Sequence, residues 1–194
     1  MVYHYEKGIN IKLTKNRIII LVIIAVVVLS FSIYTFYVPK PIYSVLVDGQ
    51  QLDFRADLRA ADKISVYPSE EELYSELTNS LVENITIAFK PADEEENPYY
   101  ILQILEIVPK LSFAYSRLGL WPNFNNDPIA IESYENLTST TSNLIIALVH
   151  PVYSNETAIR IKDNVIYLKA KSHEDFDLVT VKLLMVALGI ELES

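Results

Sequence analysis

An uncharged apolar stretch near the N-terminus constrains this chain more than any other feature. It begins at Ile18 and ends at Val38, and the nearest charged residues are Arg17 and Lys40. As a helix it would be about 30 Å long, the thickness of the hydrocarbon core of a bilayer. Ile and Val are poor helix formers in water, but in lipid a helix satisfies every backbone hydrogen bond internally. We therefore predict a transmembrane anchor over residues 18–38, with the lipid bilayer as its partner.

A cleaved signal peptide is the alternative interpretation of the same stretch. Residues 18–29 alone have the length of a signal-peptide apolar region, and residues 30–32 form a weak small-residue cleavage site. The apolar run continues past those serines, however, and Tyr34, Phe36 and Tyr37 form an aromatic belt at its outer end. A signal peptide does not need such a belt, so the uncleaved anchor is favoured.

The flanking charges predict the orientation of the anchor. Four basic residues lie within residues 1–17, whereas only Lys40 and Arg55 follow the span within a comparable distance. The positive-inside rule then places the short basic segment in the cytoplasm. We expect a proline-containing stalk at residues 39–41 and a single extracytoplasmic domain over residues 42–194, in a single-pass protein of the cell membrane.

Composition limits what the outer domain binds and where it is made. The chain has 16 basic and 25 acidic residues; without residues 1–17, which hold four basic and one acidic residue, 12 basic and 24 acidic residues remain. Such an acidic domain repels phosphate backbones, so we expect no nucleic acid partner. The chain has no cysteine, which favours a prokaryotic surface over a secreted animal protein. With only four glycines, it also has no Gly-rich phosphate loop.

Hydrophobic periodicity predicts an α+β (or α/β) domain with a mixed sheet. We expect about six to eight strands, of which 144–149 should be central, and two hairpins within that sheet. Asp48 with Gly49, and residues 162–164, supply the hairpin turns. Three main helices are predicted, at residues 68–81, 97–118 and 172–188.

The two longest helices differ in their apolar pattern. The predicted core stripe of the first consists of Ile101, Ile104, Leu105, Val108, Leu111, Tyr115 and Leu118. Pro109 should kink or break that helix. The last helix is apolar almost all round, which predicts burial on most sides or contact with a partner.

One polar set is a candidate anion site. Arg55 and Arg59 flank Asp57 directly after the first hairpin, and two guanidinium groups can bind a carboxylate or phosphate. The simpler interpretation is an internal salt bridge that braces a short helix.

Three Asn-x-Thr sequons lie in the segment predicted to be outside, at Asn84, Asn136 and Asn155. We predict glycosylation at Asn136 and Asn155, which lie in polar segments between strands. Asn84 is a weaker acceptor because it begins a predicted strand.

No catalytic, cofactor or metal motif stands out. The candidates for an enzymatic site are His150, Glu156, Asp175 and Asp177, but a hydrogen-bonded structural histidine and carboxylates at a helix N-terminus explain most of them. The acidic run at residues 93–96 is explained by solvated charge, with weak calcium binding as the alternative.

The sequence resembles no family, so function is predicted from organisation alone. We expect an extracytoplasmic interaction or assembly domain of a prokaryotic, archaeal-type cell envelope, with a protein partner in that envelope. The alternative is a membrane-anchored envelope hydrolase or transferase that uses carboxylates and His150.

Overall fold

The computed structural model describes residues 43–91, 97–125, 129–135 and 137–192, all within a unit that extends over residues 41–194. It has a mixed α+β fold, as predicted, with a mixed sheet and four α-helices among the described residues. Within those ranges, no helix is both long enough and apolar enough to cross a membrane. The anchor predicted at residues 18–38 lies outside the described residues.

The first hairpin forms as predicted but does not join the main sheet. β1 (Tyr43–Val47) pairs antiparallel with β2 (Gln50–Phe54) in a two-stranded sheet of their own. Asp48 and Gly49 form the turn with φ values of 49° and 82°, the left-handed region that a tight hairpin of this type requires. The expectation that one sheet would carry both hairpins is therefore wrong.

The main sheet has seven strands. Their order is β3 (Ser65–Tyr67), β8 (Ala158–Lys162), β9 (Val165–Lys169), β7 (Asn143–Val149), β4 (Asn84–Phe89) and β5 (Asn123–Phe124), with β6 (Ile129–Ala130) also paired to β4. β4, β7 and β9 run parallel, and β8 returns antiparallel to β9 through the predicted turn at residues 162–164. β7 is central, in agreement with its continuously apolar sequence.

Serine side chains begin two of the helices at the predicted positions. The helices are α2 (Leu58–Asp62), α3 (Glu70–Leu77), α4 (Asn97–Arg117) and α5 (His173–Leu188), and a short 3-10 helix, η1 (Pro151–Tyr153), follows β7. Ser69 caps α3 and Ser172 caps α5, each by accepting a backbone N–H three residues ahead. Gly189 ends α5 with a φ of 64°.

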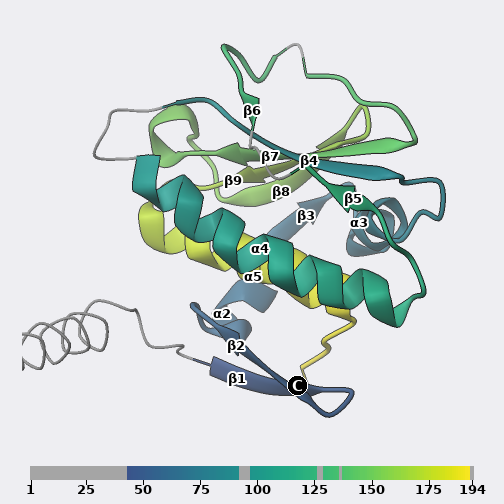
Figure 1. Cartoon of the computed structure of the whole chain (residues 1–194). Helices are drawn as coiled ribbons and strands as arrows, with labels where there is room; N and C mark the ends of the chain where they lie inside the picture. Colours follow the sequence, from purple (N-terminus) through teal and green to yellow (C-terminus); the bar gives the residue numbers. More distant parts are fainter. Residues whose placement is uncertain (1–42, 92–96, 126–128, 136, 193–194) are drawn as a thin grey trace, which may run out of the picture. The chain divides into compact units, whose positions relative to one another are not determined.

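α5 occupies the centre of the molecule (Figure 1). It lies beside α4 under one face of the main sheet, and α2 packs against it from the opposite side. Residues of the β1–β2 hairpin, including Phe54, join the same hydrophobic core. A helix with neighbours on all these sides needs little polar surface, which explains its apolar sequence.

α4 buries only part of the stripe that the apolar pattern predicted: Leu111 and Tyr115 are buried and Ile104 and Val108 pack against the core, but Ile101, Leu105 and Leu118 are exposed. It is one continuous helix that contains Pro109. The polar residues Gln103 and Glu106, in contrast, are buried. Gln103 donates a hydrogen bond to Asp177 of α5 at 2.7 Å, and Glu106 pairs with Lys110 at 2.7 Å. These partners make it possible for polar side chains to face the core.

Candidate anion-binding face

The main sheet has one covered face and one face that the helices leave uncovered. Side chains alternate along each strand, so Ile166 and Leu168 of β9 join the core shared with the helices, while Tyr167 and Lys169 point the other way. We call the second side, which carries Arg160 and Tyr167, the open face. Among the described residues, Tyr134 and Leu137 pack on it and form a small second core with strands β7 and β9.

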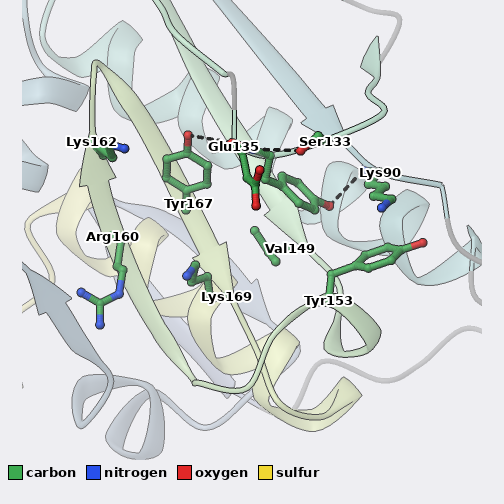
Figure 2. A pocket seen from close by; sticks show the side chains of 10 residues that line it. Lys90, Ser133, Glu135, Val149, Tyr153, Arg160, Lys162, Tyr167 and Lys169 are labelled. Atoms are coloured by element: carbon green, nitrogen blue, oxygen red, sulfur yellow. Dashed lines mark hydrogen bonds between the residues drawn. The ribbon is translucent and has the colours of Figure 1, made fainter.

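A pocket of about 480 Å³ lies on the open face (Figure 2). The segment that covers part of the face contributes Ser133, Tyr134 and Glu135 to it. The remaining lining side chains come from five different elements or their ends: Lys90, Val149, Tyr153, Arg160, Lys162, Tyr167 and Lys169. Its size lies within the range of about 300–1,000 Å³ that is typical of ligand sites.

The lining is cationic, although the chain as a whole is acidic. Four of its ten residues are basic and only Glu135 is acidic, in a chain of net charge −9. The open face is therefore an island of positive charge that the overall composition does not reveal.

Three tyrosine hydroxyls fix the backbone that carries Lys90. The Tyr134 hydroxyl accepts from the backbone N–H of Lys90 at 2.9 Å and donates to the carbonyl of Leu148 at 2.6 Å. Tyr100 donates to the Lys90 carbonyl at 2.6 Å, and Tyr153 donates to the carbonyl of Pro91 at 2.6 Å. Burial raises the pKa of the Tyr134 hydroxyl, which keeps it a neutral donor.

The Lys90 ammonium lies 4.6 Å from the centre of the Tyr153 ring, a cation–π contact at the rim of the pocket. Within the described ranges, no carboxylate oxygen lies within 4.0 Å of this ammonium. Its charge is thus available to a ligand.

Glu156 holds two of the pocket's cations, Arg160 and Lys169, beside each other. It accepts from the Arg160 guanidinium at 2.8 and 2.6 Å and from the Lys169 ammonium at 2.8 Å. Hydrogen bonds from Arg160, and then from Lys169, lower the pKa of the Glu156 carboxyl to about 2. Two cations share one carboxylate, so this trio keeps a net positive charge.

The arginine pair proposed from the sequence does not form the expected salt bridge. Asp57 instead caps α2 by accepting from the backbone N–H of Arg59 at 2.8 Å. No ion pair of Arg55 or Arg59 occurs in the part of the chain that the structure describes, and Arg55 Nε is buried there without a hydrogen-bond partner. Neither arginine lines the open-face pocket. Anion binding at Arg55 and Arg59 stays a prediction.

The sequons lie in unlike surroundings. Asn155 is exposed in the loop between η1 and β8. Asn84 begins β4, which lies between β7 and β5, and the Thr86 of its sequon is buried, with its hydroxyl bonded to Asn143 and Asn125. Asn136 lies outside the described residues. Glycosylation at all three stays a prediction.

The candidates for an enzymatic site are not brought into one pocket. His150 is fully buried, its Nε2 3.2 Å from His173 Nε2, and is surrounded by the rings of α4 and α5. Asp175 accepts from Thr157 at 2.7 Å, and Asp177 accepts from Gln103. Neither these residues nor Glu156 line the open-face pocket. Among the residues described, no group of three or more His, Asp or Glu side chains is arranged to hold a metal ion.

Sequence reasoning missed the open face, although part of its signal was present. Arg160, Lys162, Tyr167 and Lys169 alternate with apolar residues on one hairpin, a pattern that predicts a shared face. Lys90, Tyr134 and Tyr153 come from distant segments, and nothing local connects them to that hairpin.

Comparison with known proteins gives no matching family model, no matching curated protein and no matching solved structure.

Proposed function

We propose that this protein is a single-pass membrane protein whose outer domain binds another component of a prokaryotic, archaeal-type cell envelope through the open face. The observation that carries the proposal is the cationic pocket on a sheet face that none of the described α-helices covers. The apolar stretch at residues 18–38 and the basic segment before it support the location. The binding role is not enzymatic, since the pocket gathers cations and tyrosines rather than the candidate acids and bases.

The rigidity of the site supports a binding role. Three tyrosine hydroxyls hold the backbone at residues 90 and 91, and Glu156 holds the side chains of Arg160 and Lys169, so the framework of the pocket is preorganised. Preorganised groups lose less conformational entropy when a ligand binds. The immediate neighbourhood of the membrane, set by the short predicted stalk, makes envelope components the accessible partners.

Photo-crosslinking in intact membranes tests this proposal. A benzoylphenylalanine at Tyr153, which is 38% exposed at the rim of the pocket, should give an adduct with an envelope component. The same probe at Tyr74, which is 42% exposed on α3 beside α5, is the matched control on the other side of the sheet. Adducts at Tyr74 but none at Tyr153 would place the binding surface elsewhere and overturn the proposal.

A further inference from the structure

We infer that the ligand of the open-face pocket is an extended acidic polysaccharide that carries uronate or sulfate groups. This inference rests on the proposed function, because it names the ligand class of the same face. The pocket's cations come from β8, from β9 and from the residue that follows β4, and the spacing, pairing and surroundings of those cations together select this class.

The spacing of the cations requires a long ligand. Lys90 follows the carboxyl end of β4, and Lys162 is the last residue of β8. β8 is three strands away from β4 in the sheet, and the strand register offsets the two lysines by four residues along the strand direction. Strands about 4.8 Å apart with a rise of about 3.3 Å per residue place these two Cα atoms about 20 Å apart. One phosphate or carboxylate cannot contact both ends, whereas a chain with repeated charges can.

The two end cations are available to such a chain. Lys90 has no carboxylate partner in the described ranges, as shown above. The Lys162 ammonium lies 3.9 Å from Asp163 Oδ2. Both side chains are largely exposed, at 72% and 58%, so this ion pair is weak. Lys169 and Arg160 share Glu156 between the ends of the diagonal. Four basic side chains thus face three carboxylates, those of Glu135, Glu156 and Asp163, which leaves a net positive charge on the row.

The surroundings of the pocket disfavour an acidic protein segment. β7 and β9, which carry Val149, Tyr167 and Lys169, are each paired on both sides, so these two strands offer no open backbone edge for an added strand. Lysine is depleted at protein–protein interfaces, yet three lysines line this pocket, and Val149 is its only aliphatic side chain. A solvated polyanion fits these features better than an apolar anchor does.

The aromatic rings also disfavour single-stranded nucleic acid. Base binding needs free ring faces as stacking platforms. The ring of Tyr153 carries the Lys90 ammonium, and the ring of Tyr67 carries the Arg160 guanidinium at 4.5 Å. Both exposed tyrosines near the pocket thus already have a cation on one face.

Binding measurements on the full chain in detergent micelles test the inference. The probes are polygalacturonate and heparin, with neutral dextran, poly-glutamate and oligo(dT) as comparisons. We expect polygalacturonate or heparin to bind, and the one that binds more tightly assigns uronate or sulfate. We also expect binding to weaken as salt rises, because the contacts are exposed charges.

Paired variants locate the binding. Lys90→Gln with Lys162→Gln should weaken polyanion binding by about tenfold, because two exposed charge contacts are lost. Lys63→Gln with Lys171→Gln makes the same change in net charge at two exposed residues that do not line the pocket, and should change binding by less than about twofold. Both pairs alter exposed or half-exposed side chains, and far-UV circular dichroism verifies that each variant is folded.

Several results would overturn the inference: equal binding of dextran, tighter binding of poly-glutamate or oligo(dT), or an equal loss in the Lys63 and Lys171 control. A crosslink at Tyr153 without polyanion binding would retain the proposed function and refute this ligand class. Polyanion binding without any crosslink at Tyr153 would refute the envelope role and leave the ligand chemistry standing.

Discussion

Lys182 shows how a single residue connects the central helix to its neighbours. It is 1% exposed on α5, and its ammonium lies 3.0 Å from Asp62 Oδ1 and 2.8 Å from Glu70 Oε1. Both carboxylate side chains are about half exposed, at 51% and 52%. The buried lysine therefore depends on these partners much more than they depend on it.

Removing both carboxylates should destabilise the protein more than removing both carboxylates and the lysine together. In Asp62→Asn with Glu70→Gln, the uncompensated Lys182 should lower the free energy of unfolding by about 3 kcal/mol, the low end for a broken buried pair, because water reaches the carboxylate side. Adding Lys182→Met should restore most of this loss, since no buried charge remains. Urea unfolding of the three chains in detergent measures the differences. A triple variant less stable than the double variant would contradict this explanation.

Glu156 should make part of the stability acid-sensitive. Its ordinary pKa is 4.5, and the Arg160 and Lys169 hydrogen bonds lower the folded-state pKa to about 2. A carboxyl with a lowered folded pKa stabilises the protein above its unfolded pKa, and this contribution is lost as pH falls from about 4.5 to about 2. Glu156→Gln should therefore be less stable at neutral pH and have a shallower acid slope. Parallel stability curves for the two proteins over that pH window would contradict it.

At the scale of elements, local signals were predictable and their assembly was not. The hairpin turn at Asp48 and Gly49 is encoded locally, because these residues accept positive φ, and it formed as predicted. Whether the hairpin joins the main sheet depends on the helices that lie between the hairpin and that sheet. A local sequence pattern does not contain this information. α4 shows the same limit: apolar periodicity alone could not reveal that Gln103 would find Asp177 and face the core.

Two leucines on neighbouring helices test this assignment of faces. Leu184 of α5 is fully buried, so Leu184→Ala should lower the free energy of unfolding by about 2–5 kcal/mol. Leu105 of α4 is 65% exposed, so Leu105→Ala should change it by less than about 0.5 kcal/mol. Thermal or urea unfolding of both variants provides the comparison. Equal costs would mean that α4 buries the stripe that its sequence pattern suggested.

At the scale of the whole molecule, charge is distributed unevenly. The net charge of −9 predicts repulsion of polyanions, but the open face collects four basic residues around one pocket. With a screening length of about 8 Å at physiological ionic strength, a ligand on that face responds mainly to the nearby cations. Composition could not reveal this face because net charge averages over surfaces that the fold separates.

The location of the outer domain is the premise of the whole account, and labelling of single cysteines tests it most directly. The natural chain has no cysteine, so Ser75→Cys on the exposed side of α3 and Asn10→Cys in the basic segment each create a unique thiol. A membrane-impermeant maleimide added to intact cells should label the cysteine at position 75 and leave the one at position 10 unlabelled until the cells are lysed. Labelling at position 10 but not at position 75 in intact cells would contradict an extracytoplasmic binding domain.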